Sequence, residues 1–405
     1  SRRQRQMCIR DRYRVVMQWP CVAYETLDWV GAEGGFAGRV AKRMPRTYQS
    51  AVVPAISEEA VTLTNGTAAI VEEATVAAVR FDATEAHRVL PFTPLLLRSE
   101  SVASSRIEQL TASARKVLEA ETTGHGTGNA ALIAANTRLM QQAIARGGAT
   151  IDGILDMHRV LLEESAPDIA GELRTQAVWI GGGDFHPDGA LFVPPQATHV
   201  AALLEDLQRF MQRTDIPALA QAALAHAQFE TIHPFADGNG RTGRALIHVL
   251  LRNRGLTSSV ALPISAGLLN NVDGYFQALT SYRAGDIEPI ITLFARAAID
   301  GAERGSWLAG ELLQVRTAWG EELTARIDAL AWPLLNLLIQ RPVLTTNAVA
   351  AEFDVSAETA RNALDRLEAD GIVVSAQLDK RQRAWRSPEV LHLLDQFAER
   401  TGRRH

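Results

Sequence analysis

Residues His233 to Arg244 (HPFADGNGRTGR) combine side-chain types that suit chemistry on a phosphate ester. Gly238 and Gly240 let backbone N–H groups turn inward without interference from a Cβ, and the helix expected to follow adds its positive N-terminal end. Arg241 and Arg244 lie three residues apart, so both guanidinium groups can cover one face of that helix. The segment therefore predicts a cradle for more than one phosphate.

Two further side chains of this segment suit metal binding and proton transfer. Asp237 is a hard oxygen ligand of the kind that Mg²⁺ uses when it bridges phosphate oxygens. His233, with an ordinary pKa of about 6.5, suits the removal of a proton from a hydroxyl at neutral pH. Taken singly, each of these residues is more often structural, but their convergence in one short segment favours a functional site.

The segment matches the signature of the Fic (Fido) family, HxFx[D/E]GNGRxxR, at every specified position, and the wider resemblance covers about residues 45–300. The resemblance implies a protein adenylyltransferase that moves AMP from ATP to a Ser, Thr or Tyr hydroxyl of a target protein. It implies His233 as the catalytic base, Asp237 as the Mg²⁺ ligand and Phe235 as a core anchor. The nucleotide-binding residues that it implies are Gly238, Asn239, Gly240, Arg241, Thr242, Gly243, Arg244, Tyr275 and Phe276.

The family resemblance extends to an inhibitory segment upstream of the motif. Ser104 to Glu108 (SSRIE) resembles the family's inhibitory motif [S/T]xxxE[G/N], although Gln109 stands where Gly or Asn is usual. The resemblance implies that Glu108 pairs with Arg244 and occupies the place of the ATP γ-phosphate. The alternative is that Glu108 is an ordinary surface residue of its helix.

The elements that must position these residues are mostly helical. Apolar spacing of a helical period runs from 129 to about 298, and two β-prone runs around a glycine-rich tip predict one hairpin at 174–193. In the family this hairpin is a flap that holds the target protein's segment as an added strand. The other predicted elements are an irregular N-terminal stretch at 14–56 and helices at 57–86, 98–122, 217–232, 242–255 and 303–331.

The last part of the chain predicts a winged helix-turn-helix. Helices at 346–353 and 357–369 precede two short β-like runs, 372–377 and 383–386. DNA contact, and docking to a protein or a second copy, both stay open, because basic and acidic residues share the second helix. The basic and polar candidates are Thr359, Arg361, Asn362, Arg366, Lys380, Arg381 and Arg383, and the acidic residues are Glu358, Asp365, Glu368 and Asp370.

Composition narrows the class of protein. A chain of 405 residues suggests two to four domains, and its net charge of −5 argues against a surface that coats nucleic acid or anionic membrane throughout. Its two cysteines, Cys8 and Cys21, cannot make a disulfide framework and suit a reducing compartment. No apolar run is long enough to span a membrane, so we expect a soluble cytoplasmic protein without membrane contact.

These observations predict a mainly α fold: a Fic helical core with a β-hairpin flap, and a C-terminal winged helix-turn-helix domain. Residues 1–13 resemble a translated sequencing adapter and are expected to be a non-native tail. The predicted divisions that follow are an N-terminal helical region with the inhibitory helix at 14–125, the Fido core at 126–300, a linking helix at 301–330 and the winged helix at 331–405.

Two other functions stay open at this point. Glu108 could position a water that removes AMP from a modified protein, which would make the chain a de-AMPylase. The chain could also be a DNA-binding regulator whose core senses nucleotide without transferring it. His226 is interpreted as a helix-packing residue in preference to a zinc ligand, because no third ligand is clustered with His226 and His233.

Overall fold

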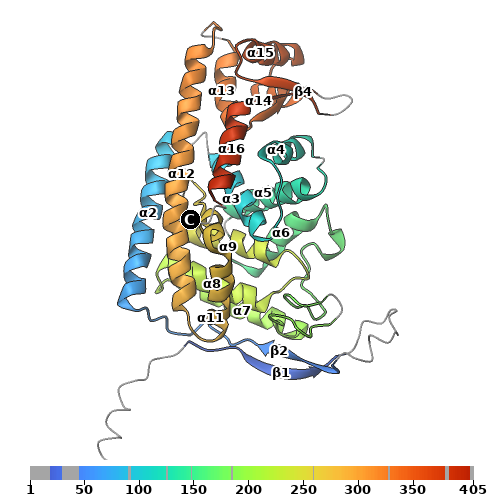
Figure 1. The fold of residues 1–405 in the computed structure, drawn as a ribbon, viewed down its shortest axis with the longest axis vertical. Coiled ribbons are helices and arrows are strands. Elements are labelled where there is room, and N and C mark those ends of the chain that lie inside the picture. Colours follow the sequence, from blue (N-terminus) through green and yellow to red (C-terminus); the bar gives the residue numbers. More distant parts are fainter. Residues whose placement is uncertain are drawn as a thin grey trace, which may run out of the picture.

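The computed structural model describes residues 19–29, 45–89, 93–124, 126–146, 148–183, 186–258, 260–326, 329–378 and 383–401. The predicted non-native tail at 1–13 and the wing-tip residues Lys380 and Arg381 lie outside this part of the chain. Helices dominate the described residues, which confirms the mainly α fold class (Figure 1). None of the described helices is both long enough and apolar enough to cross a membrane.

A group of helices around the motif forms the central body of the fold. Helix α8 (Ala218–Ile232) is rich in alanine and is buried along almost its whole length, because small side chains let neighbouring helices approach it from every side. Helix α9 (Asn239–Asn253) packs against it and confirms the helix predicted at 242–255, with a start three residues earlier. The other helices of the body are α5 (Asn129–Arg146), α6 (Ile151–Leu162), α7 (Val200–Met211), α10 (Ile264–Leu268) and α11 (Val272–Arg283), with short 3₁₀ turns at Pro167–Ile169, Ala197–His199 and Leu269–Asn271.

The predicted flap at 174–193 closes as a hairpin but lacks the two regular strands expected of it. One antiparallel bridge joins Ile180 to Phe192, and no strand pair extends from it within the described residues. The first run bonds elsewhere, since the N–H of Arg174 donates to Pro234 O at 3.0 Å. The flap is therefore attached at its base to the motif loop.

An antiparallel pair of strands corrects the expectation of an irregular stretch at 14–56. Strand β1 (Ala23–Asp28) pairs with β2 (Thr47–Val52) in a register that opposes Ala23 to Val52. The N–H of Ala51 donates to Val193 O at 3.0 Å, so β2 also borders the flap. The glycines and prolines of the stretch hid the strand signal that tyrosine, threonine and valine give within the two runs.

Two long helices run side by side along one edge of the molecule (Figure 1). Helix α12 (Glu288–Glu322) has 35 residues and so measures about 52 Å. Helix α2 (Asn65–Val89) packs along it and begins later than the predicted start at 57. The helix predicted at 303–331 corresponds to the C-terminal part of α12, but α12 ends at Glu322, nine residues earlier than predicted. It also continues without a break across the predicted domain boundary at 300/301.

The single helix predicted at 98–122 is in fact two helices. Helix α3 (Thr93–Ile107) ends just before Gln109, whose φ of 63° is left-handed. Helix α4 (Ala114–Thr123) starts anew after Ser113, whose side chain accepts a hydrogen bond from Lys116 N as an N-cap. The turn between the two helices leaves Glu108 at the end of α3.

Residues 331–401, here called the C-terminal module, confirm the predicted winged helix-turn-helix. Three antiparallel strands lie in the order β3-β5-β4 beside a helix-turn-helix. The final helix returns from the wing to pack against α3, α4 and α12 (Figure 1). The elements of the module are α13 (Ala331–Gln340), β3 (Val343–Thr345), α14 (Thr346–Phe353), α15 (Ala357–Ala369), β4 (Val374–Gln377), β5 (Arg383–Arg386) and α16 (Pro388–Arg400).

Candidate active site

The motif loop, residues 233–238, is bounded by two left-handed residues. His233 ends α8 with a φ of 51°, and Gly238 precedes α9 with a φ of 75°. Asn239 ties the loop from inside, since its side-chain amide accepts from Phe235 N and donates to Phe235 O, both at 2.9 Å. Phe235 is fully buried, which confirms it as a core anchor. The Asn239 side chain thus holds the loop, while backbone N–H groups at the start of α9 remain available to an anion.

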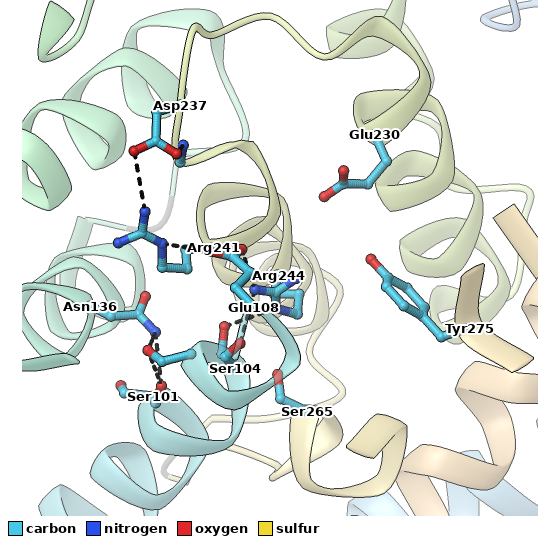
Figure 2. Close-up of polar contacts among 12 residues, drawn as sticks. Ser101, Ser104, Glu108, Asn136, Glu230, Asp237, Arg241, Arg244, Ser265 and Tyr275 are labelled. Carbon is cyan, nitrogen blue, oxygen red and sulfur yellow. Dashed lines mark hydrogen bonds and ion pairs between the residues drawn. The ribbon is translucent and has the colours of Figure 1, made fainter. Parts of the chain in front are cut away.

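Glu108 lies over the start of α9, close to both arginines of the motif (Figure 2). Its Oε1 is 2.7 Å from Arg244 Nη2, which confirms the predicted contact. Its Oε2 is 2.9 Å from Arg241 Nε, a second contact that the sequence did not predict. A Cβ at Gly240 would lie only 2.3 Å from Glu108 Oε1, so this approach requires glycine there. Both cations of the cradle are therefore engaged by one carboxylate.

Helix α3 is fixed against α9 by polar contacts at two successive turns. Ser104 accepts hydrogen bonds from Arg244, at 2.8 Å through Oγ and at 3.0 Å through its carbonyl oxygen (Figure 2). Four residues earlier, the Glu100 carboxylate is 2.9 Å from His248 Nε2. Both helices thus present partners at a spacing of four residues, which aligns them along one face.

A further buried contact fixes α3 from its other side. The Asn136 amide, on α5, donates to Ser101 O at 2.9 Å and to Ser105 Oγ at 3.1 Å (Figure 2). Asn136 is fully buried, so this contact is strong in its low-dielectric surroundings. Helix α3 is therefore held between α5 and α9, with Glu108 at its exit.

His233 presents a neutral imidazole to the motif cavity. Burial, assisted by the positive charges of Arg174 and Arg283, lowers the pKa of His233 from 6.5 to about 3. Its Nδ1 lies 3.8 Å from Glu230 Oε2. A neutral imidazole can accept a proton, and the negative charge of a bound polyphosphate shifts the pKa of His233 back toward neutrality.

Arg174 fixes the backbone around His233, a role that sequence analysis missed. Its guanidinium donates to His233 O at 2.8 Å, to Pro195 O at 2.6 Å and to Ile232 O at 3.3 Å. Burial lowers the pKa of Arg174 to about 10, which still leaves it charged at neutral pH. Arg174 therefore joins the base of the flap to the end of α8 and sets the position of His233.

His158, on α6, supports the motif loop from below and was also missed. Its ring stacks on Phe235 with 3.7 Å between ring centroids. The N–H of Gly171 donates to Nδ1 at 3.0 Å, so the ring proton resides on Nε2, which donates to Asp237 O at 3.0 Å. Burial lowers the pKa of His158 to about 4, so the neutral tautomer persists at neutral pH.

Asp237 is the candidate Mg²⁺ ligand of the site. Its side chain is 66% exposed, and its Oδ2 is 3.8 Å from Arg241 Nη2. Its Oδ1 accepts from Gly238 N at 2.7 Å. An accessible carboxylate beside an anion cradle fits Mg²⁺, which typically takes one or two carboxylates together with phosphate oxygens and waters. Among the described residues, no group of three or more His, Cys, Asp or Glu side chains could hold a metal unaided.

The two aromatic residues expected to bind the nucleotide, Tyr275 and Phe276, differ in exposure. Tyr275 is buried, and its hydroxyl lies 2.7 Å from His226 Nε2. Phe276 is half exposed on the same helix, α11. Both line the motif cavity, which keeps them as candidate nucleotide contacts. His226 is fully enclosed, and burial lowers its pKa to about 3, which accords with a packing role.

Glu230 is a buried carboxyl group in the wall of the motif cavity, and sequence analysis did not identify it. Burial raises the pKa of Glu230 to about 7, although Arg244 acts in the opposite direction. Within the described part of the chain, its Oε1 has no hydrogen-bond partner. Figure 2 shows Glu230 and Tyr275 on the side of the site opposite Asp237.

The motif cavity has a volume of about 330 Å³ and brings most of the predicted residues together. Arg241, Thr242 and Gly243, also expected to bind nucleotide, are not among its lining residues. Gly243 faces α8, where a Cβ would lie 2.9 Å from Phe229 Cδ1. The cavity is lined by Ile107, Glu108, Trp179, Ile180, Glu230, His233, Ala236, Asp237, Gly238, Asn239, Gly240, Arg244, Tyr275 and Phe276.

Comparisons with known proteins agree with this site. Residues 149–251 match the Fic/DOC family, and residues 333–376 match the DeoR-like helix-turn-helix domain. A crystal structure of a Fic family protein from Desulfovibrio desulfuricans G20 is similar in fold, with a TM-score of 0.54 and 22% identity over 81% of this chain and 98% of that one.

Curated relatives are similar to part of the chain. The chain is 32% identical to protein adenylyltransferase fic-1 of Caenorhabditis elegans over 147 residues, which is 36% of this chain and 27% of that protein. It is 31% identical to protein adenylyltransferase Fic of Drosophila erecta over 168 residues, 41% of this chain and 31% of that protein. The chain thus spans less than a third of the length of these relatives.

Proposed function

We propose that this chain, which carries a Fic/DOC domain at residues 149–251, is a protein adenylyltransferase whose own Glu108 inhibits it. It would transfer AMP from ATP to a Ser, Thr or Tyr hydroxyl of a target protein. The observation that carries the proposal is the placement of His233, Asp237 and Arg244 around one cavity, with Glu108 bound to the arginine. The names of the curated relatives support the same activity.

In this mechanism the chain binds the polyphosphate and supplies the base. Arg241, Arg244 and the N–H groups at the start of α9 bind phosphate oxygens. His233 takes the proton of the acceptor hydroxyl while the hydroxyl oxygen forms a bond to the α-phosphorus of ATP. The bond from that phosphorus to the bridging oxygen breaks, and pyrophosphate leaves. The target gains AMP, and the proton resides on His233.

Asp237 would hold Mg²⁺ together with the nucleotide. When bound, the metal supplies positive charge to the phosphate oxygens. Two contacts that hold the motif loop do not involve the metal: the Asn239 side-chain amide bonds to Phe235, and Arg174 donates to the His233 backbone. Both contacts restrict the loop before substrate arrives, which favours a productive geometry.

Inhibition follows from the position of Glu108. Its carboxylate engages both Arg241 and Arg244, so it adds negative charge where the terminal phosphates of ATP would lie and occupies their cationic partners. ATP could then bind only with its γ-phosphate displaced. Because near-attack alignment is worth roughly 7–11 kcal/mol of barrier, even a small displacement suppresses transfer.

The target protein is proposed to dock along the flap at 174–193, beside the cavity. Trp179 and Ile180 of the flap line the cavity, and Leu191 near its tip is largely exposed. A segment placed there would bring its hydroxyl toward His233. Main-chain hydrogen bonds of an added strand accept many sequences, so the flap alone gives little side-chain specificity.

The direct test is transfer of label from α-labelled ATP to protein in the presence of Mg²⁺. Three proteins are compared: the parent, the Glu108→Gly variant, and the variant that combines Glu108→Gly with His233→Ala. We expect label on protein with Glu108→Gly and a loss of 10²–10⁴-fold when His233→Ala is added. Label at equal rate in both variants would exclude His233 as the base.

Removal of AMP is the competing activity, because Glu108 lines the same cavity and could position a water. The Glu108→Gly variant separates the two reactions: transfer should rise, whereas removal of AMP from a pre-labelled protein should fall if Glu108 serves the reverse reaction. A nucleotide sensor without transfer would bind ATP and give no label in any variant.

A further inference from the structure

A second cavity, of about 360 Å³, lies where α3, α4 and α5 meet the C-terminal module. Its size falls in the range of pockets that take small-molecule ligands. It shares no residue with the motif cavity. It is lined by Arg98, Leu118, Glu121, Thr122, Thr137, Arg138, Gln141, Arg341, Val343, Leu344 and Ala348.

The charges around this junction cavity favour an anion. Its lining holds three guanidinium groups, those of Arg98, Arg138 and Arg341, against the single carboxylate of Glu121. Arg138 and Arg341 have partners outside the lining: Arg138 Nη2 is 2.9 Å from Glu164, and Arg341 Nη1 is 3.5 Å from Glu352. The carboxylates of Glu164 and Glu352 lie outside the lining, so an anion in the cavity would meet three guanidinium groups and only the Glu121 carboxylate.

The floor of the cavity is already organised. Arg98 donates to Glu121 Oε2 and to Gln340 O, both at 2.6 Å, and so links α3, α4 and α13. Two buried polar atoms nearby, Arg138 Nε and Glu121 Oε1, have no hydrogen-bond partner among the described residues. An unsatisfied buried donor or acceptor is unfavourable, so both atoms favour a ligand with a complementary group.

We propose that the junction cavity binds a small phosphate-bearing molecule that also carries a hydroxyl or amino donor. Arg138 and Arg341 would bind its phosphate, because a planar guanidinium group can donate two parallel hydrogen bonds to phosphate oxygens. The donor would satisfy Glu121 Oε1. Such a ligand would touch α3 through Arg98 and the module through Arg341, and would join the two.

Inorganic pyrophosphate supplies the phosphate group of this ligand without the donor, so it probes the guanidinium groups of the cavity. It is titrated calorimetrically into the full chain with EDTA and no metal. The cavity variant is Arg138→Gln with Arg341→Gln, and the matched control is Arg146→Gln, an exposed arginine of α5 that does not line the cavity. Arg244→Ala reports binding in the motif cradle. The readout is binding without turnover, so it is independent of the proposed transferase activity.

We expect the cavity variant to bind pyrophosphate at least tenfold more weakly than the parent, and Arg146→Gln to bind it with the affinity of the parent. Binding that is lost in Arg244→Ala and kept in the cavity variant would place the site in the motif cradle and overturn the proposal. Arg341→Gln alone, at a half-exposed position, should already weaken binding several-fold. No binding to the parent, or binding that survives the cavity substitutions, would overturn the proposal.

Discussion

Glu108 Oε1 lies 2.7 Å from Arg244 Nη2, although the two residues are 136 positions apart in the chain. The contact places the end of α3 on the first turn of α9, where the motif's phosphate cradle begins. A carboxylate held there competes with a nucleotide for the same guanidinium groups. The balance between these two partners therefore sets the activity of the proposed enzyme.

Gln109 weakens the inhibited arrangement from within. It adopts a φ of 63° just after Glu108, a left-handed conformation that costs a non-glycine residue about 1 kcal/mol. Gln109→Gly should relieve this strain, hold Glu108 more firmly and lower basal transfer about fivefold. Gln109→Val should raise it, and Gln109→Asn should lie between Gly and Gln. The rate of self-modification is measured for each variant and should rise in the order Gly, Asn, Gln, Val at position 109. Rates that do not follow this order would argue against strain at Gln109.

The C-terminal module holds the segment that carries Glu108. Arg106, two residues before it, donates to Ala398 O, and Ala114 N, beyond it, donates to Asp395 Oδ1 at 2.9 Å. Asp395→Ala should loosen the segment and raise transfer several-fold in the parent. In the Glu108→Gly background the same change should have no effect.

His392→Ala is the matched control for this experiment, because His392 is exposed on the same helix and pairs with Gln396. Its transfer rate should equal that of the parent. An equal rise for Asp395→Ala with and without Glu108 would show that α16 acts on the enzyme by another route.

Stability should depend on pH through His158. Its pKa is about 4 in the fold and 6.5 ordinarily, so between these values the unfolded chain binds a proton that the folded chain does not. The folded state thus loses stability as pH falls from 6.5 toward 4, by on the order of 3 kcal/mol from this residue.

The measurement compares the free energy of unfolding of the parent and of His158→Gln in urea at several pH values. Glutamine can keep both hydrogen bonds but does not titrate. The stability advantage of the parent should therefore shrink as the pH is lowered. Parallel pH profiles would mean that His158 is not held neutral.

Binding of DNA by the C-terminal module is expected to be weak. The described arginines near the second helix are paired: Arg366 with Asp370 at 3.0 Å, Arg383 with Glu368 at 2.9 Å and Arg361 with Asp365 at 3.5 Å. The acidic partners oppose phosphate contacts. Anisotropy of a labelled duplex should show no binding by the full chain at about 0.15 M salt. Tight binding that falls steeply with salt would contradict this expectation.

The motif itself could be predicted because its residues are contiguous. The left-handed residues His233 and Gly238 and the start of α9 place His233, Asp237 and the arginines around one loop. This arrangement is local and does not depend on the packing of distant helices. Glu108 was found only through the family resemblance, because its contact with Arg244 depends on how α3 packs against α9. Nothing local in the sequence states that packing.

The supporting residues could not be predicted for a related reason. Arg174 donates to carbonyl groups of two separate segments, those of Ile232 and His233 and that of Pro195, and His158 reaches Asp237 O across 79 positions. These contacts exist only once the helices are assembled. The break between α3 and α4, in contrast, had a local signal that was overlooked, since Ser113 is a good N-cap residue.

The most direct test of the account is the rate of label transfer from α-labelled ATP in three proteins: the parent, Glu108→Gly, and Glu108→Gly with Arg244→Ala. Removal of the carboxylate frees the guanidinium groups, so Glu108→Gly should exceed the parent by at least tenfold, and loss of Arg244 should abolish that gain. A Glu108→Gly rate equal to or below that of the parent would contradict inhibition by Glu108.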